Sequence, residues 1–142
     1  MKPFLNQLEH ERIEQAISEA EKATSGEIRV MISPDRIEDP VHRASHEFAR
    51  LGMHRTAHRN GVLIFVAPNS RCFAIHGDKA IHQKCGEGFW RDVAAAMERR
   101  FREGRFTDGL VDAVLEAGRE LSCHFPAEPG NRDELPNSVI DG

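Results

Sequence analysis

One stretch of the sequence has the spacing of a cysteine that attacks phosphorus. Cys85 and Arg91 are separated by five residues, the arrangement in which a thiolate attacks while backbone N–H groups and the arginine hold the phosphate oxygens. Cys85, however, is expected after a short helical turn rather than after a strand, and Glu87 within the run would repel a phosphate. The motif therefore lends this chemistry little support.

Histidines and cysteines also recur at spacings that could suit a metal. His42 and His46 are four residues apart, and so are His54 and His58, which on a helix places both rings on one face. No HExxH motif accompanies either pair, so these histidines are interpreted as solvated side chains. An alternative metal set lies on and after a predicted strand: Cys72, His76, His82 and Cys85. Its spacing matches no common zinc module.

Several common motifs of enzymes are missing from the sequence. It contains no GxxxxGK[ST], no GxSxG and no dinucleotide-binding glycine pattern, so nucleotide hydrolysis, triad esterase chemistry and Rossmann cofactors lose their usual support. We therefore expect no nucleotide or organic cofactor.

The remaining candidate residues are mainly acidic and lie in or beside predicted loops. Glu27, Asn60 and Asp78 offer the oxygen ligands that calcium or magnesium takes, and Arg59 stands beside them. We predict a metal site formed by Glu27, Asn60 and Asp78, with Asp78 and Arg59 as the candidate catalytic residues. The alternative is structural: Glu27 and Arg59 form an ordinary surface pair, and Asp78 caps the following helix. Both interpretations stay open.

These residues need elements to position them, and the hydrophobic pattern supplies an order of helix, strand, helix, strand, strand, helix, helix. Asp39-Pro40 is a helix start, because the carboxylate can accept from free N–H groups and proline loses no bond at the first helical position. The predicted elements are an amphipathic helix over 4–23, strands over 27–32, 61–67 and 72–76, a helix over 40–51 with Val41, Ala44, Phe48 and Leu51 buried, and helical segments over 81–101, interrupted at 86–88, and 106–121.

The predicted fold class is α/β, a three-layer α/β/α sandwich. A right-handed crossover joins the first two strands in a βαβ unit, a β-hairpin follows, and two C-terminal helices complete the mixed sheet. Because the third strand runs antiparallel, its end at 76–78 meets the starts of the first two strands at 25–27 and 59–61. The opposite edge gathers 33–35 and 68–70 near 103–108, and it competes for any function.

Size and composition set the class of protein. The chain has 142 residues, a mass of 16.0 kDa, a net charge of −4 and 39% hydrophobic residues. This size and composition suit one folded domain. The chain lacks the excess of basic residues that a nucleic-acid-binding protein needs. We expect no signal peptide, because the first twenty residues hold no long apolar run. We also expect no integral membrane segment, because the longest apolar run, 62–67, is far shorter than the roughly 20 residues of a membrane helix. Three cysteines without a CxxC pair indicate reduced thiols and a cytoplasmic location. Residues 127–142 are expected to be an acidic tail, flexible or docked, that follows a domain over 1–126.

Four segments, in order, resemble the TPM domain family. They are 20–30 (AEKATSGEIRV), 59–67 (RNGVLIFVA), 75–78 (IHGD) and 101–109 (FREGRFTDG), and the resemblance spans about residues 5–125. It departs from the family at Gly77-Asp78-Lys79, which replaces the more common Gly-x-Gly-hydrophobic-Glu continuation, so an acidic site carried over from the family depends on Asp78 with Glu27 as its neighbour.

The resemblance implies an α/β sandwich and several different activities. A plant thylakoid-lumen member is described as an acid phosphatase, bacterial members as calcium binders, and an animal member as an auxiliary protein of a receptor channel. Two hypotheses follow for this chain. It is a divalent-ion-binding or protein-interaction module whose loops and tail contact a protein partner; or it is a metal-dependent acid phosphatase, in which an ion on Glu27 and Asp78 polarises a phosphate ester while Arg59 balances the charge.

Overall fold

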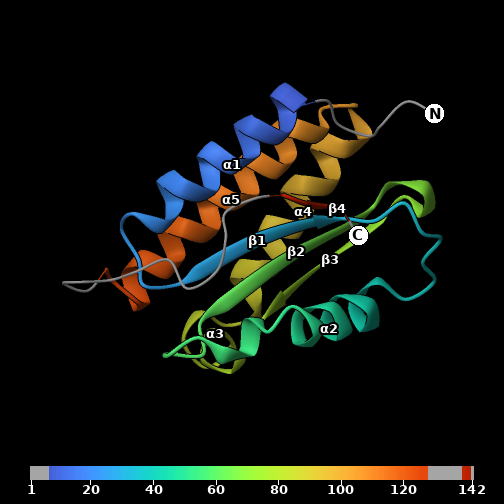
Figure 1. The fold of residues 1–142 in the computed structure, drawn as a ribbon. Coiled ribbons are helices and arrows are strands. Elements are labelled where there is room, and N and C mark those ends of the chain that lie inside the picture. The colour runs from blue at the N-terminus through green and yellow to red at the C-terminus, as the bar shows by residue number, and fades with distance from the viewer. Residues whose placement is uncertain (1–6, 128–138, 142) are drawn as a thin grey trace.

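The computed structural model describes residues 7–127 and 139–141. Along the chain its elements are α1 (Gln7–Glu21), β1 (Glu27–Ile32), α2 (Pro40–Arg50), the 3₁₀ turn η1 (Met53–Arg55), β2 (Gly61–Ala67), the 3₁₀ turn η2 (Pro68–Ser70), β3 (Cys72–Gly77), α3 (Lys79–Cys85), α4 (Glu87–Arg102), α5 (Phe106–His124) and β4 (Ile140–Asp141) (Figure 1). The predicted order of elements up to α5 is confirmed. The predicted interruption at 86–88 separates α3 from α4 at Gly86, which has φ +76°.

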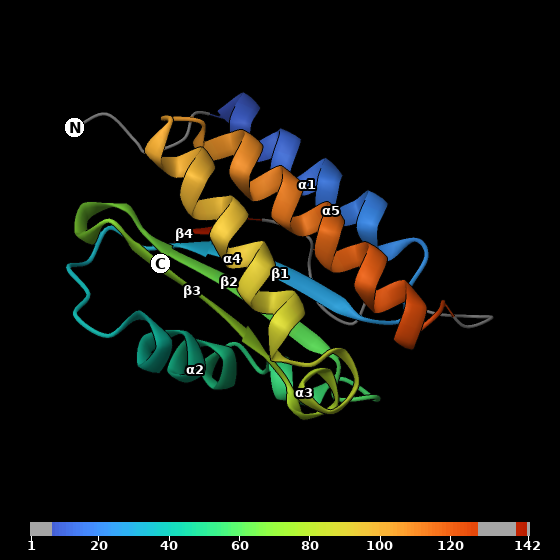
Figure 2. The ribbon, with the colours of Figure 1, turned by 180° about the vertical axis from the view of Figure 1, so that it is seen from behind.

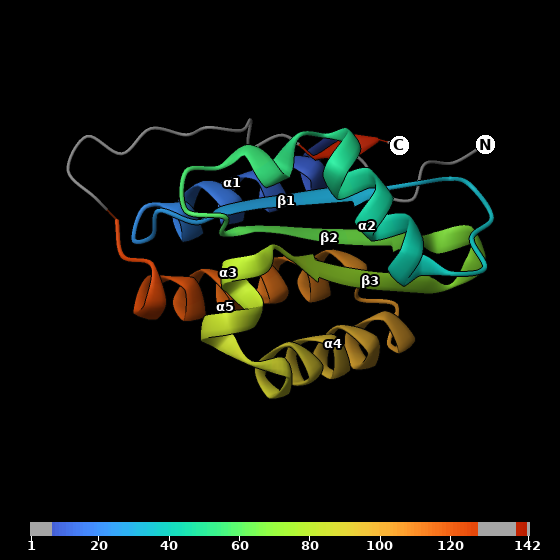
Figure 3. The same ribbon diagram turned by 90° about the horizontal axis from the view of Figure 1, so that it is seen from below.

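The three-layer α/β/α sandwich is confirmed. The mixed sheet has the strand order β3-β2-β1-β4, with β1 parallel to β2 and β2 antiparallel to β3. Helix α2 covers one face, and α1, α4 and α5 cover the other (Figures 1, 2 and 3). A hydrophobic core lies on each face of the sheet, and alternate residues of β2 contribute to the two cores. Val62 and Ile64 pack with α1 and α5, whereas Leu63 and Phe65 pack with α2. All seven residues of β2 are buried, as expected of a central strand.

Helix α2 begins as predicted but buries a different face. The Asp39 carboxylate accepts a hydrogen bond from the His42 N–H at 3.0 Å. Ala44 and Phe48 are buried, but the expectation for Val41 is wrong, because its side chain is 68% exposed. Glu47 takes a place on the buried face instead, because hydrogen bonds from Arg43 (3.1 Å) and Arg50 (2.6 Å) neutralise its carboxylate there. The buried stripe is therefore rotated away from Val41.

The end of the predicted tail forms a strand that the sequence pattern did not indicate. Ile140 and Asp141 pair with Met31 and Ile32 in parallel register, so β4 extends the sheet beside β1. The Val139 N–H donates to a Glu14 carboxylate oxygen at 3.3 Å. Residues 139–141 therefore lie against the sheet, whereas 128–138 and 142 lie outside the described residues. None of the helices in the described part of the chain has the length and apolar character needed to cross a membrane.

The contact between α1 and α5 depends on one glycine. A Cβ added at Gly118 would lie 2.5 Å from the Ala20 Cβ and 3.0 Å from its Cα. The two helices therefore approach with almost no side chain between them, which places α5 directly against α1 above the sheet.

Replacing this glycine is expected to separate the two helices. Gly118→Ala should lower the free energy of unfolding by about 1–3 kcal/mol, the usual cost of overpacking, as measured by urea denaturation. Gly88→Ala is the matched control, because Gly88 is also helical and a Cβ there meets nothing within 4 Å. It should leave stability unchanged or raise it by up to about 1 kcal/mol. Equal losses in both variants would contradict the packing argument.

Candidate functional site

The predicted meeting of three chain segments at one edge of the sheet is observed. Glu27 is in register with Gly61, and the Asp78 N–H donates to the Gly61 carbonyl at 2.9 Å. The Ala80 N–H donates to the Arg59 carbonyl at 3.2 Å. The loop before β2 is thereby tied to the first turn of α3, and the side chains of Arg59 and Asp78 come from these two segments.

Arg59 and Asp78 form a two-pronged ion pair. Arg59 Nε lies 2.9 Å from Asp78 Oδ2, and Arg59 Nη2 lies 3.0 Å from Asp78 Oδ1. The Asp78 carboxylate is buried and also accepts from the Lys79 N–H at 2.7 Å, so it caps α3 as the structural alternative expected. The pKa of Arg59 is raised by its hydrogen bonds to Asp78 and by the charge of that carboxylate.

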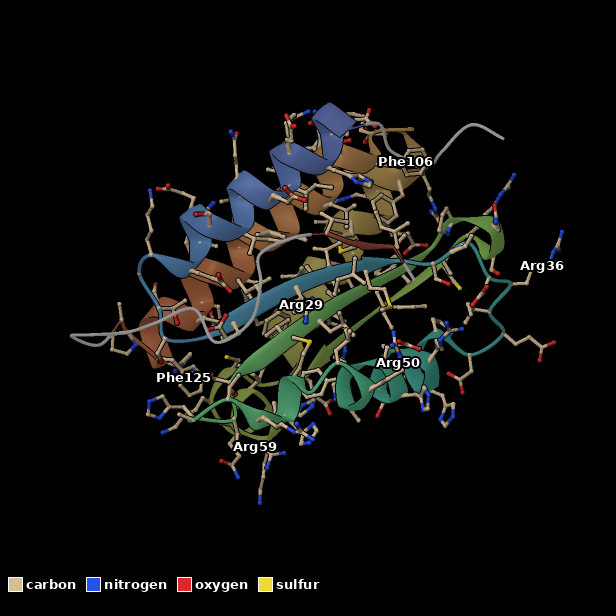
Figure 4. The ribbon with its side chains drawn as sticks, viewed as in Figure 1. Arg29, Arg36, Arg50, Arg59, Phe106 and Phe125 are labelled. Atoms are coloured by element: carbon tan, nitrogen blue, oxygen red, sulfur yellow. The ribbon has the colours of Figure 1, made fainter. Side chains whose placement is uncertain are left out.

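The Arg59 guanidinium is held on one side and open on the other. Its side chain is half exposed, whereas that of Asp78 is 5% exposed. The backbone of Arg59 has φ +53°, a left-handed conformation that is uncommon for a residue with a side chain and is often found where function requires it. In Figure 4, Arg59 lies at the end of the molecule near α3, among side chains tipped with nitrogen.

The other two predicted ligands point to different partners. Asn60 is 1% exposed, and its Nδ2 donates to Ser25 Oγ at 3.2 Å, while its buried Oδ1 has no hydrogen-bond donor. Glu27 is 2% exposed and shares its strand face with Arg29. Burial lowers the pKa of Arg29, and the charges of Glu21 and Glu27 oppose that shift. Glu27 therefore belongs to the electrostatic surroundings of Arg29.

Basic side chains surround the Arg59–Asp78 pair. Segments 53–60 and 78–85, joined by the contacts above, contain four Lys or Arg residues and three His, and their one acidic residue is Asp78. We call the exposed part of this cluster the basic edge: Arg55, His58, Arg59, Lys79, His82 and Lys84. It was not identified from the sequence, although the local runs HRTAHR and KAIHQK carried the signal.

His76 lies behind the basic edge, on β3. Its ring packs edge-on against Phe48 with 4.6 Å between the ring centroids. Burial lowers the pKa of His76, the nearby His82 lowers it further, and Asp78 opposes the shift. His76 therefore loses its proton at a lower pH than a solvent-exposed histidine does.

The alternative chemistries and the opposite edge gain no support from the geometry. Burial and the charge of Glu120 raise the pKa of Cys85 to about 11, the reverse of what a nucleophilic thiolate needs. At the opposite edge of the sheet, Asp35 pairs with Arg43 at 3.0 Å. Asp108 there accepts from Arg12 at 3.1 Å and from Arg105 at 3.0 Å.

The fold and this edge define a class: a single α/β/α domain with a four-stranded mixed sheet and a charged edge where β1 and β2 begin and β3 ends. A family model described as the TPM domain matches residues 2–120. The chain therefore belongs to the TPM domain family.

Solved structures agree with this assignment. The NMR structure of the BA42 protein from the psychrophilic bacterium Bizionia argentinensis is 40% identical to this chain with a TM-score of 0.92, and the match covers 100% of this chain and 98% of BA42. The N-terminal domain of a protein from P. gingivalis is 18% identical with a TM-score of 0.70 over 86% of this chain and 79% of that domain, a likeness of fold alone. A search of curated proteins found no match.

The lowered pKa of His76 predicts how stability depends on pH. The unfolded chain takes up this proton near the ordinary value of 6.5, before the folded chain does. The free energy of unfolding should therefore hold its full value above pH 6.5 and fall as pH drops through the lower folded pKa. Urea denaturation at a series of pH values measures this slope. His76→Gln should flatten it, whereas His46→Gln on the exposed face of α2 should not; an unchanged slope in His76→Gln would contradict the prediction.

Proposed function

We propose that this TPM domain binds phosphate esters at the basic edge, with Arg59 as the central contact. The observation that carries the proposal is the Arg59–Asp78 pair. Asp78 holds Nε and Nη2 of the guanidinium at 2.9 and 3.0 Å, and the half-exposed remainder offers N–H donors in a fixed direction. An arginine oriented in this way by a buried carboxylate suits a phosphate better than a freely rotating side chain does.

The charge around Arg59 supports an anionic ligand. The chain as a whole carries a net charge of −4, yet the two segments that form the basic edge hold four cationic side chains and one carboxylate, which is already paired. Such a local excess of positive charge favours anions and attracts them from solution.

A bare calcium or magnesium ion fits the same residues less well. Both Asp78 oxygens accept hydrogen bonds from the guanidinium, so a cation would have to displace Arg59 to reach them. Glu27 lies in the field of Arg29. The three predicted ligands thus do not form a ready oxygen cage for a catalytic ion.

The acid phosphatase hypothesis is a further step from binding to turnover. Arg59 and its cationic neighbours could stabilise the charge that develops on a transferring phosphoryl group. At this edge the side chains of Ser25 and Thr56 are buried and their hydroxyl oxygens accept hydrogen bonds from Asn60, so neither hydroxyl is open to a ligand. The basic edge therefore supports ester binding more directly than it supports hydrolysis.

The binding proposal predicts a large effect at Arg59 alone. Arg59→Gln should weaken binding of inorganic phosphate by about tenfold or more, because a charged, oriented donor is lost. The measurement is a phosphate titration followed by backbone amide shifts, repeated with phenyl phosphate to represent an ester. Arg71→Gln is the matched control: Arg71 is also exposed, has φ +52°, and lies at the other end of the β2–β3 hairpin.

The outcomes separate binding from turnover. The proposal is supported if the amide shifts centre on 55–59 and 78–84 and vanish in Arg59→Gln. If Arg71→Gln weakens phosphate binding as much as Arg59→Gln does, the binding is a general attraction between charges and the proposed site is wrong. Release of phosphate from phenyl phosphate, assayed with and without added calcium or magnesium, then tests the phosphatase hypothesis. Binding without turnover leaves a ligand-binding module.

Divalent-ion binding at Glu27, Asn60 and Asp78 is the second candidate, and one atom favours it. Asn60 Oδ1 is a buried amide oxygen without a hydrogen-bond donor, and such an atom is normally satisfied by water, a protein group or an ion. An amide oxygen of this kind is an accepted ligand of calcium.

A calcium titration of chelator-treated protein, followed by magnesium, tests this candidate through the amide shifts. If Asn60 Oδ1 binds the ion, shifts should saturate at residues 25–28 and at Asn60, and Asn60→Ala should abolish them. Asn69→Ala, in the turn at the opposite edge, should titrate like the native chain. Shifts that centre instead on Asp35, Asn69 and Asp108 would move the ion to the opposite edge.

Two further expectations stay predictions. A protein partner was expected at the edge loops and the acidic tail, and most of that tail lies outside the described residues. A cytoplasmic location follows from the cysteine content alone, and the structure describes all three cysteines as free.

A further inference from the structure

A second cluster of reactive side chains lies at the opposite end of α3 from Asp78. Cys85 is the last residue of α3, and Glu120 and His124 lie one turn apart in the last part of α5. One donor atom from each residue, the Cys85 Sγ, a Glu120 oxygen and a His124 ring nitrogen, lies within 4.8 Å of the other two. In the described part of the chain, this is the one group of three such residues gathered so closely.

The donor set has a definite metal preference. Thiolate, imidazole and carboxylate together are ligands of zinc, whereas calcium and magnesium take oxygen ligands. We propose that Cys85, Glu120 and His124 form a zinc-binding site that joins α3 to α5. The proposal is independent of the phosphate site, because it uses none of the residues of the basic edge.

The spacing of the donors suits zinc after a small adjustment. Zinc–ligand bonds are about 2.0–2.3 Å long, so tetrahedral ligand atoms lie about 3.5 Å apart. His124 Nε2 and Glu120 Oε1 are already 3.0 Å apart, and no donor pair exceeds 4.8 Å. A side-chain movement of about 1 Å would bring Cys85 Sγ to the distance from the other two donor atoms that tetrahedral zinc requires.

The surroundings leave room for a fourth ligand. Cys85 and Glu120 are partly buried and His124 is exposed, so an ion can enter from the His124 side. Three protein ligands with one open position describe a zinc site that retains a water. When zinc binds, a Zn–S bond forms, the Cys85 thiol releases its proton to solvent, and the Glu120–His124 hydrogen bond gives way to two metal bonds.

The expected consequence is a cross-link between two elements. Helix α3 has only seven residues, and α5 is the long helix that packs on α1. Zinc would tie the end of α3 to the end of α5, close to where Phe125 accepts hydrogen bonds from Thr24 and Ser25. Binding to the folded chain alone raises its thermal stability.

The site differs from the metal set that the sequence indicated. That set combined Cys72, His76, His82 and Cys85. In the structure Cys72 Sγ lies 3.8 Å from the Ile37 carbonyl oxygen, and of the four residues only Cys85 joins the cluster with Glu120 and His124.

The test uses the full chain, reduced and freed of metal with a chelator. It is titrated with zinc by calorimetry and with cobalt by absorption, because a cobalt–thiolate bond gives a charge-transfer band in the near ultraviolet. The variants are Cys85→Ser and His124→Ala, with Cys123→Ser as the matched control, since Cys123 is an exposed free thiol next to His124 in the chain. We expect one zinc per chain, a thiolate–cobalt band, and a rise in melting temperature on adding zinc.

The variants decide the assignment. Cys85→Ser should abolish the thiolate–cobalt band, and His124→Ala should weaken zinc binding by about tenfold or more, while Cys123→Ser changes neither. His124→Ala alters an exposed side chain, so it tests the site even if Cys85→Ser fails to fold. The proposal is overturned if no thiolate band forms, if Cys123→Ser rather than Cys85→Ser removes it, or if zinc binds His124→Ala as tightly as the native chain.

Discussion

A buried carboxylate needs a counter-charge, and the way Asp78 obtains one organises this end of the molecule. Its two oxygens accept from Arg59, and one also accepts from the first N–H of α3. The same residue therefore starts a helix, follows directly after β3 and orients the guanidinium of Arg59. Removing Arg59 would leave the buried Asp78 carboxylate without its counter-charge, which is costly. At this edge, the outer side of the oriented Arg59 guanidinium is exposed to solvent.

The short helix α3 then connects two regions with different chemistry. It begins at the Asp78 cap beside the basic edge and ends at Cys85 beside Glu120 and His124. Nitrogen donors and positive charge dominate the first region, which favours oxygen-rich anions. Sulfur, nitrogen and oxygen donors meet in the second, which favours a borderline-soft metal ion. Helix α3 is seven residues long, so the two regions lie at opposite ends of one short element.

Sequence reasoning succeeded where the signal was local. The continuous apolar run of β2, the Asp39-Pro40 start of α2 and the glycine at 86 each predict structure from neighbouring residues, and the antiparallel hairpin then brings Arg59 and Asp78 to one edge. The failures were non-local. Val41 fits a helical apolar stripe, but Glu47 could be buried because Arg43 and Arg50 neutralise it. A strand as short as Ile140–Asp141 has no periodicity to read, and its pairing with β1 depends on residues more than a hundred positions away. Glu120 and His124 have the spacing of an ordinary surface pair, and only the packing of α3 against α5 places Cys85 beside them.

Whether the sheet edge favours a cation or an anion depends on the charges that already lie beside its acidic residues. Glu27 and Asp78 look like a metal pair in the sequence because they are the acidic residues that the topology gathers there. In the folded chain each lies close to an arginine, Glu27 to Arg29 and Asp78 to Arg59. A cation at Asp78 would have to displace the Arg59 guanidinium, whereas a phosphate would add to a guanidinium that is already in place. Lys79 adds another positive charge beside Asp78, which favours an anion over a cation at this position.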